Sequence, residues 1–426
     1  MAGTSPYILI IVLSALVILS YVYGLIAKQT NIPSVLLLIV TGMGITLLIK
    51  YFELPFIDTN WIPILEILGI VGLVMIVLEA ALDLELTKEK WPIIWKSFLV
   101  ALLCLAATSF LFTLLFKLFF LAETRSAILF SIPLAIVSSA IVIPSVSNCR
   151  EEIKEFLIYE STFSDILGIM VFYFVLEGFE APPGTNLFLD ITGNLILTIA
   201  ISIISAYVLT IIFQNITSQV KLFLLIAVLL MLYSIGKMLH ISSLLIILFF
   251  GLMINNHKLF FVRGLDKYVD HRRVIQTLKY FKIITLETAF VVRTFFFIVF
   301  GMSITLASLV NLEILIISLV FLGVIFIVRY VFFASVAKQF MIPSLFVSPR
   351  GLITILLFFA IPESFGIPLF DNGVLLYVIL LSSGIMTLAL ITREKEEKLP
   401  GILKATSRML KAGEKEGNPS DKTEGE

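Results

Sequence analysis

Residues 159–168 read YESTFSDILG and lie inside an apolar run that extends from 156 to 178. At about 100° per residue, a helix places five of these residues on one face, within an arc of about 140°. They are Glu160, Ser161, Ser164, Asp165 and Gly168. Serine and threonine alone often join helices inside a membrane, but two carboxylates exceed what that contact requires. The segment is therefore a candidate functional site rather than a packing seam.

The composition of the whole chain places this run in a membrane. Of the 426 residues, 59 % are hydrophobic and only 14 % are charged, and the mean hydropathy is +1.09. Soluble domains carry about 25 % charged residues, so a soluble enzyme is excluded. Thirty basic and thirty acidic residues cancel, which gives no indication of a nucleic-acid partner. Cys104 and Cys149 predict neither a disulfide framework nor a metal cluster, and we expect no cofactor.

Apolar runs long enough to cross the hydrocarbon layer recur about thirteen times along the chain. The runs are 7–27, 33–49, 62–81, 92–119, 127–146, 156–178, 187–214, 221–236, 241–256, 281–305, 313–333, 343–361 and 374–392. They predict an all-α polytopic membrane protein of about thirteen transmembrane helices, although twelve or fourteen spans also fit. We predict a transmembrane domain over residues 1–392 and a short, disordered cytoplasmic tail over residues 393–426.

The basic residues predict the orientation, because Lys and Arg accumulate in short cytoplasmic loops. With the N-terminus outside, most of them fall in inward loops. These are Lys28, Lys88, Lys90, Arg150, Lys154, Lys221, Lys258, Arg263, Lys267, Arg272, Arg273, Lys279, Lys282 and Lys338. The outward loops carry only Lys50, Lys117, Arg125 and Lys237. We therefore expect a multi-pass protein of the plasma (inner) membrane, with its C-terminus in the cytoplasm.

Ionisable side chains at bilayer depth cost a few kcal/mol each and mark protein interiors, partners or water-filled paths. The candidates are Glu66, Glu79, Glu160, Asp165, Lys237, Glu287, Arg293, Arg329 and Arg350. We interpret Glu66, Lys237 and Arg329 as residues near span ends whose side chains reach the interface. Arg293 lies nearly two turns after Glu287, so a contact with another helix is favoured over a direct pair. No role follows for either residue.

The acidic segment has the chemistry of an ion site. A carboxylate in a dry interior favours its neutral form, so it can hold a proton near neutral pH. Oxygen ligands suit hard cations, so an acid beside serine hydroxyls and freed backbone carbonyls is a candidate alkali-cation site. Competition between a proton and a cation for one acid is antiport in its minimal form. The candidate ion- and proton-binding residues are Asp165, Ser161, Ser164, Ser138 and Ser139.

Two spans carry interruptions at corresponding places in the two halves of the chain. Residues 132–145 read IPLAIVSSAIVIPS, with two prolines around a Ser-Ser pair, and residues 342–351 read IPSLFVSPRG. Proline frees backbone carbonyls and glycine loosens the turn, so both spans are candidates for discontinuous helices. Broken spans in matching positions are typical of inverted-repeat transporters. A kink without a transport role is the alternative for either segment.

These segments resemble the cation/proton antiporter superfamily, which has the sodium/proton exchanger fold. Residues 160–165, ESTFSD, are similar to the family's E-S-x-x-N-D signature. Further stretches agree in order with other family motifs. They are NIPSV at 31–35, LEAALDL at 78–84, GLMINN at 251–256, FFIVFGMSI at 296–304 and SPRG at 348–351. Each motif alone is weak, but their order and spacing together are specific.

The resemblance implies the exchange of a monovalent cation, with Na⁺ favoured, for H⁺. It implies a homodimer in which a dimerisation scaffold supports a six-helix core that moves as an elevator. By position, Asp165 would be the acid shared between cation and proton, and Ser161 would supply a hydroxyl ligand. Glu160 would form a structural ion pair with Arg350. A buried glutamate independently needs a cation nearby.

Two departures from the family pattern leave alternatives open. Ser164 stands where the family has Asn, not the second Asp of the electrogenic branch, which favours an electroneutral exchange. Ser138 and Ser139 stand where exchangers often carry Thr-Asp, which resembles the potassium-handling branch and leaves Na⁺ versus K⁺ open. The missing acid also keeps an uncoupled, channel-like relative as an alternative. An intramembrane enzyme is disfavoured, because the three histidines lie at span ends or in an inner loop.

Overall fold

The computed structural model describes residues 6–30, 33–52, 62–87, 89–146, 149–180, 200–212, 221–238, 243–261, 271–303, 311–371 and 373–392. Within these ranges the chain is helical, with no strand. The longer helices are α1 (Pro6–Thr30), α2 (Ser34–Tyr51), α3 (Ile62–Asp83), α4 (Trp91–Phe120), α5 (Thr124–Ala135), α7 (Glu151–Glu180), α9 (Lys221–Met238), α10 (Ser243–Asn255), α12 (His271–Ser303) and α13 (Leu312–Val336). The shorter ones are α6 (Ser139–Ser145), α11 (His257–Phe260), α14 (Met341–Ser344), α15 (Leu352–Phe359) and the 3-10 turns η3 (Lys338–Phe340) and η4 (Glu363–Phe365).

The predicted polytopic helical architecture is confirmed. Eight described segments, among them the helix at 373–392, are long and apolar enough to cross a membrane. Shorter apolar helices occupy residues 200–212, 222–236 and 246–255. The count of about thirteen spans stays a prediction, because several connecting segments lie outside the described residues. The expected tail at 393–426 lies outside them as well.

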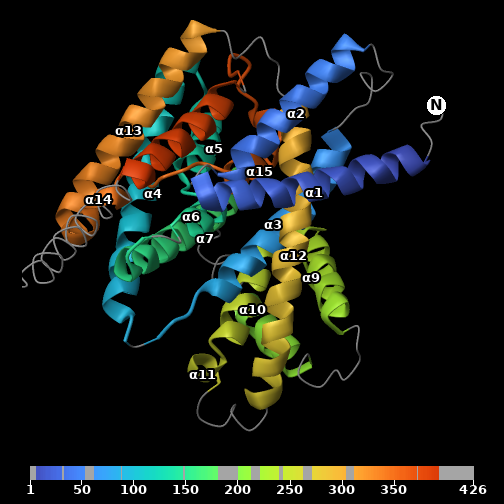
Figure 1. The fold of residues 1–426 in the computed structure, drawn as a ribbon. Coiled ribbons are helices and arrows are strands. Elements are labelled where there is room, and N and C mark those ends of the chain that lie inside the picture. Colours follow the sequence, from blue (N-terminus) through green and yellow to red (C-terminus); the bar gives the residue numbers. More distant parts are fainter. Residues whose placement is uncertain are drawn as a thin grey trace, which may run out of the picture.

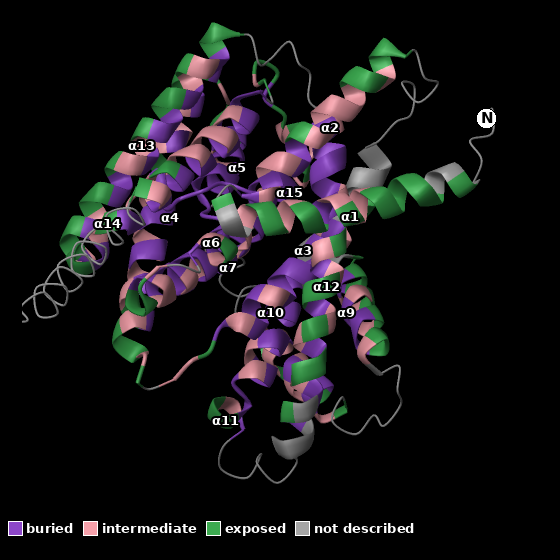
Figure 2. Cartoon of the chain, viewed as in Figure 1, coloured by how far each residue is buried: buried purple, intermediate pink, exposed green. Residues whose placement is uncertain are grey.

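The helices form two groups that stand side by side in Figure 1. In the first, which we call the core group, α4 packs against α5, α7 and α13, α6 packs against α7, and α15 packs against α5. In the second, the scaffold group, α12 packs against α1, α2 and α3, and α10 packs against α3 and α9. Figure 2 shows buried residues concentrated in α5 and α15, whereas α1 and α13 expose much of their surface. The large exposed side chains of α1 are apolar, as a helix that faces lipid requires.

Two glycines bring α2 and α12 into close contact within the scaffold group. A Cβ atom added at Gly42 would collide with the backbone carbonyl of Ile298, and one added at Gly301 would collide with that of Ile39. Small residues let helix backbones approach closely in membranes, where packing rather than hydrophobic burial drives association. Backbone atoms cannot move aside as a flexible side chain does, so this contact depends on glycine.

Replacement of Gly42 by Val is therefore expected to weaken the scaffold. Overpacking of a tight contact typically costs about 1–3 kcal/mol, so the thermal unfolding midpoint in detergent should fall by several degrees. The matched control is Gly44→Val on the same helix, because an added Cβ there has nothing within 4 Å. Equal midpoints for the two variants would show that the α2–α12 contact does not limit stability.

Both predicted discontinuous helices are confirmed. The first span ends as α5 at Ala135, continues in extended conformation over 136–138 and resumes as α6 at Ser139. The second ends as α14 at Ser344 and resumes as α15 at Leu352. The two interruptions, which we call the first break (136–138) and the second break (345–351), lie against each other.

A hydrogen bond and a glycine hold the two breaks together. The backbone N–H of Ser138 donates to the carbonyl oxygen of Pro349 over 2.9 Å. A Cβ atom added at Gly351 would collide with the side chain of Ser138, so only glycine permits this approach. The breaks therefore meet at the centre of the core group, where irregular backbone is buried in protein rather than exposed to lipid.

Candidate functional site

The polar face of α7 holds the first break in place. The backbone N–H of Val137 donates to Oγ of Ser164 over 2.9 Å, and the N–H of Ser139 donates to Oδ2 of Asp165 over 2.9 Å. Buried amide groups need partners, and an interrupted helix supplies none of its own. Adjacent residues of the signature segment therefore satisfy the backbone of the broken helix.

Asp165 is the acidic member of this arrangement, and one of its oxygens has bonding capacity left. Its side chain is buried, with 1 % of the residue exposed. Oδ2 accepts the bond from Ser139, whereas Oδ1 is also buried and has no hydrogen-bond partner within the described part of the chain. A carboxylate oxygen in that condition is costly unless it binds a proton or a cation. The arrangement can therefore hold one positive charge at Oδ1.

The predicted serine ligands divide into two kinds. Ser138 is buried, and its Oγ has no partner among the described residues, so this hydroxyl of the first break is available as an oxygen ligand. Ser161 instead donates its hydroxyl to the carbonyl of Leu157 in its own helix over 2.7 Å. This bond uses the proton but leaves lone pairs on the oxygen. Ser139 binds Asp165 through its backbone N–H and Ser164 binds the first break at Val137, while the ligand roles of Ser138, Ser139, Ser161 and Ser164 stay predictions.

The expected ion pair between Glu160 and Arg350 is wrong. Arg350 belongs to the second break, and its buried side chain lies against the C-terminal end of α5. Its Nε donates to the carbonyl of Leu134 over 2.8 Å and its Nη2 to that of Ala135 over 3.2 Å. Its Nη1 donates to the carbonyl of Ser348 over 2.7 Å. The last carbonyls of a helix have no partner inside the helix. Arg350 supplies them with donors and thereby joins the end of α5 to the second break.

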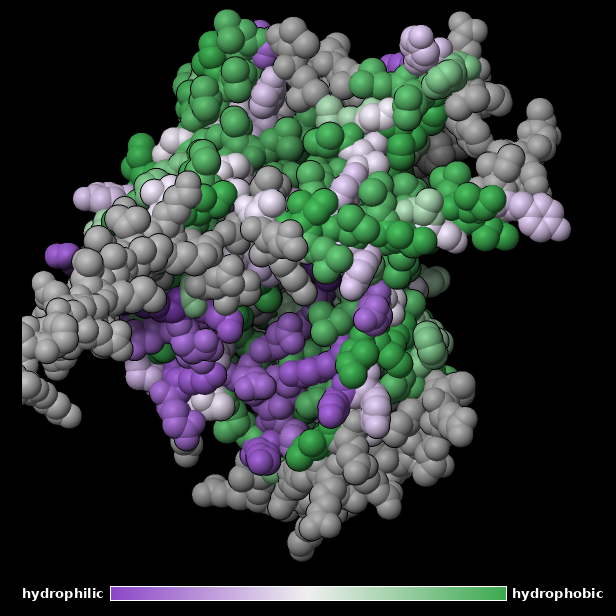
Figure 3. Space-filling model, in the orientation of Figure 1, coloured by the Kyte–Doolittle hydropathy of each residue, from purple (hydrophilic) through white to green (hydrophobic). Residues whose placement is uncertain are grey.

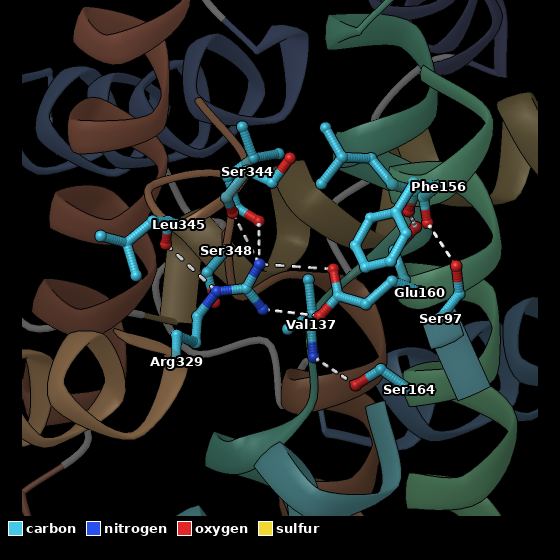
Figure 4. A network of polar contacts seen from close by, with 12 residues as sticks. Ser97, Val137, Phe156, Glu160, Ser164, Arg329, Ser344, Leu345 and Ser348 are labelled. Atoms are coloured by element: carbon cyan, nitrogen blue, oxygen red, sulfur yellow. Dashed lines mark hydrogen bonds and ion pairs between the residues drawn. The ribbon is translucent and has the colours of Figure 1, made fainter. Parts of the chain in front are cut away.

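Glu160 pairs with Arg329 of α13 instead. Nη1 of Arg329 lies 2.6 Å from Oε1 of Glu160, and Nη2 lies 3.3 Å from Oε2, which makes a two-pronged contact. The same guanidinium donates to the carbonyls of Ser344, Leu345 and Val347 at 2.8, 3.1 and 3.1 Å. Figure 4 shows Arg329 between the second break and Glu160. One buried arginine therefore joins the signature helix to the second broken helix.

The interpretation of Arg329 as a residue whose side chain reaches the membrane interface is also wrong, because Arg329 lies deeper in the protein than the predicted span implies. The predicted span ends at 333, but α13 continues to Val336 and is followed directly by η3 and α14. Arg329 is 1 % exposed, because Glu160 and the carbonyls of the second break surround its guanidinium. The signal available in the sequence was chemical, since a buried glutamate needs a buried cation. The side chains of Glu66 and Lys237, interpreted in the same way, lie outside the described ones.

A cavity lies between the scaffold group and α6, and it extends to Ser139, the residue that follows the first break. It measures about 230 Å³ and is lined by residues of α3, α6 and α12. Its polar lining residues are Glu79, Asp83, Arg293 and Ser139. Ser139 connects the cavity with the candidate ion site, because it lines the cavity at the start of α6 and its backbone N–H binds Asp165. We call this space the entrance cavity.

Arg293 contacts Glu79 across the entrance cavity, with 3.2 Å between Nη2 and Oε1. The prediction that Arg293 meets another helix rather than Glu287 is thus confirmed. Glu287 itself is exposed on α12. The surface near this part of the molecule is polar: Figure 3 shows hydrophilic side chains gathered between the lower ends of α4 and α7 and those of α10 and α12.

Comparisons with known proteins agree with this architecture. A sequence model of the family described as sodium/hydrogen exchanger, transmembrane, matches residues 12–394. A structure of the sodium/proton antiporter MjNhaP1 from Methanocaldococcus jannaschii at pH 8 has a TM-score of 0.65 at 19 % identity, over 91 % of this chain and 99 % of that one. A second MjNhaP1 structure, from an electron-microscopy map, has a TM-score of 0.60 at 19 % identity, over 92 % and 96 %. No curated protein sequence matches the chain.

At such low identity the two structures show a shared fold. The family assignment rests on the sequence model, which spans nearly the whole chain. Two broken helices that contact each other, one of which binds a buried carboxylate, in a polytopic helical membrane protein, are consistent with it. The chain belongs to the sodium/hydrogen exchanger family.

Proposed function

We propose that this chain exchanges a monovalent cation, with Na⁺ favoured, for H⁺ across a membrane, at Asp165 and one for one. The observation that carries the proposal is the state of the Asp165 carboxylate. Oδ2 is held by the backbone of the first break, while Oδ1 is buried and unpartnered among the described residues. The carboxylate is therefore fixed in position yet still able to bind one cation or one proton.

Burial provides the coupling between the two substrates. An unpaired carboxylate in a dry interior costs several kcal/mol, so the site is far more stable with a positive charge bound. We assume that the site can switch from one side of the membrane to the other only when the charge of Asp165 is neutralised. The site then crosses the membrane with either a proton or a metal ion bound. Each full cycle then moves one cation in one direction and one proton in the other.

The charges around Asp165 support an electroneutral cycle. Glu160 is paired with Arg329 and Glu79 with Arg293, so these carboxylates already have a basic partner. Ser164 and Ser139, which contact the first break and Asp165, are neutral. The proton-loaded and cation-loaded forms then carry the same charge. The membrane potential would have no work to do on either form.

K⁺ remains the second candidate cation because of the ligands of the first break. Besides Asp165, the break offers the neutral oxygen of Ser138 and backbone carbonyls, and no second carboxylate. Neutral oxygens can replace the hydration shell of K⁺ as well as that of smaller ions. The assay for function therefore has to include both cations.

The placement of the ligands supports an elevator-type mechanism. Asp165, Ser138 and Ser139 all belong to the core group, whereas two walls of the entrance cavity, α3 and α12, belong to the scaffold group. Sliding of the core group along the scaffold would carry the whole site without taking it apart. The homodimer, the plasma membrane location and the outside N-terminus stay predictions.

Purified protein in liposomes that contain a pH-sensitive dye tests the proposal. Addition of Na⁺ or K⁺ outside acidified vesicles should restore fluorescence, because cation entering would drive protons out. Thiocyanate, a permeant anion that collapses the membrane potential, should leave the rate unchanged if exchange is electroneutral. No response to Na⁺, K⁺ or Li⁺ at any neutral or alkaline pH would refute antiport. Cation flux without opposing proton movement would indicate an uncoupled pathway instead.

A further inference from the structure

The entrance cavity contains an ion pair that the antiport mechanism above does not use. Its members, Glu79 of α3 and Arg293 of α12, come from the same group of helices and both line the cavity. Their side chains are 15 % and 19 % exposed, so both are largely withdrawn from solvent but remain open to the cavity. An ion pair in this place faces any cation that approaches Asp165 past Ser139.

The pair is incomplete on the acidic side. Arg293 Nη2 contacts Oε1 of Glu79, and Nε of Arg293 donates to the carbonyl of Ala289 over 3.3 Å in its own helix. Oε2 of Glu79 is buried and has no hydrogen-bond partner among the described residues. The guanidinium therefore neutralises the carboxylate with a single contact and leaves one oxygen of Glu79 unused.

Such a geometry makes Arg293 a competitor of the transported cation. Two unit charges about 4 Å apart interact by roughly 4 kcal/mol at the effective dielectric constant typical near a protein surface. An approaching cation is thus repelled by the guanidinium and attracted by Glu79 to similar extents. Asp83, one helical turn further along α3, lines the same cavity and adds a second acidic group. Without Arg293, the residues that line the cavity would present two carboxylates and no basic group.

We propose that Arg293 sets the apparent affinity for the transported cation. Its ion pair with Glu79 in the entrance cavity reduces the electrostatic attraction of that cavity for cations. The inference rests on the proposed function and concerns the same site. Such an ion pair would speed the release of the cation from the site, because a cavity that bound cations too tightly would slow their departure. Arg293 would thus favour turnover at the expense of affinity.

Arg293→Gln is the variant that tests this inference in the liposome assay. Loss of the guanidinium should lower KM for Na⁺ by about fivefold to tenfold, and kcat should stay level or fall. Arg293→Lys, which keeps the charge, should restore a KM close to that of the unaltered protein. Lys279→Gln is the matched control, because Lys279 is an exposed cation on the same helix outside the cavity lining. It should change KM less than twofold.

The acidic partner gives the opposite sign. Glu79→Gln leaves Arg293 without its carboxylate and should raise KM several-fold. In the double variant, Glu79→Gln with Arg293→Gln, the two effects should largely cancel, because both charges are gone. If the single variants acted only through lost packing, the KM of the double variant would differ from that of the unaltered protein by more than the KM of either single variant.

Binding measured without transport separates the two proposals. Na⁺ that binds the folded protein raises its thermal midpoint, and the Na⁺ concentration at half of the maximal rise reports affinity. Arg293→Gln should move this concentration down by the same factor as KM. If the unaltered protein exchanges Na⁺ for H⁺ but Arg293→Gln leaves both quantities within twofold, the role of Arg293 is refuted and the antiport stands. If the unaltered protein shows no exchange, the proposed function fails first.

Discussion

Asp165→Asn is expected to reduce cation-driven proton movement to the background of protein-free liposomes. The amide oxygen of Asn can still accept the N–H of Ser139, so the first break keeps its shape. The amide, however, neither binds a proton near neutral pH nor carries the charge that attracts a cation. Because a neutral amide is easier to bury than an unpaired carboxylate, the thermal midpoint should stay the same or rise.

Two further measurements make this prediction specific. The rise in thermal midpoint caused by Na⁺ should disappear in Asp165→Asn, because the ion has lost its ligand. Glu287→Gln is the control, since Glu287 is an exposed carboxylate on α12 and its loss should leave exchange and cation-induced stabilisation intact. An Asp165→Asn protein that exchanges at half the normal rate or faster would remove Asp165 from the mechanism.

The parts of the fold that could be predicted are those set by local chemistry. Prolines at 133 and 144 and the run SPRG predict broken helices; the first break lies between the two prolines, which are themselves inside α5 and α6, and the second contains SPRG. The polar face of residues 160–168 requires partners, and the first break supplies them as backbone amides. Each inference needs only helix geometry and the cost of buried polar groups.

The ion pair of Glu160 could not be assigned in the same way. Arg329 and Arg350 are both buried cations that meet the need of a buried carboxylate, and the sequence alone does not order them. The choice depends on how the two broken helices cross, which places the end of α5 beside Arg350 and Glu160 beside Arg329. The hydrogen bond of Ser161 to its own helix was more accessible to prediction, since buried serine often bonds four residues back.

The ion pair in the entrance cavity shows the same limit for contacts between helices. Glu79 and Arg293 are 214 residues apart in the chain, and only the packing of α12 on α3 brings them together. Helical spacing disfavours a pair between Arg293 and Glu287, but the sequence does not name the partner. Contacts within a helix are thus predictable from spacing, whereas contacts between helices need the fold.

Arg329→Met is the variant expected to cost the most stability. It leaves the Glu160 carboxylate as a buried, unpaired charge and removes the donors of the Ser344, Leu345 and Val347 carbonyls. Removal of one member of a buried ion pair typically costs about 3–5 kcal/mol. Titration of the detergent-solubilised protein with a denaturing detergent should therefore show unfolding at a much lower concentration, and expression should fall.

A double-mutant cycle tests the pairing itself. Glu160→Gln alone should destabilise less than Arg329→Met, because the amide keeps an acceptor for the guanidinium. When both substitutions are combined, the loss should be smaller than the sum of the single losses, since no unpaired charge remains. The parallel cycle of Glu160→Gln with Arg350→Met should show the smaller coupling, because Arg350 bonds to the carbonyls of Leu134 and Ala135. A larger coupling between Glu160 and Arg350 would reverse the assignment of the two arginines and reinstate the pairing that the family resemblance implies.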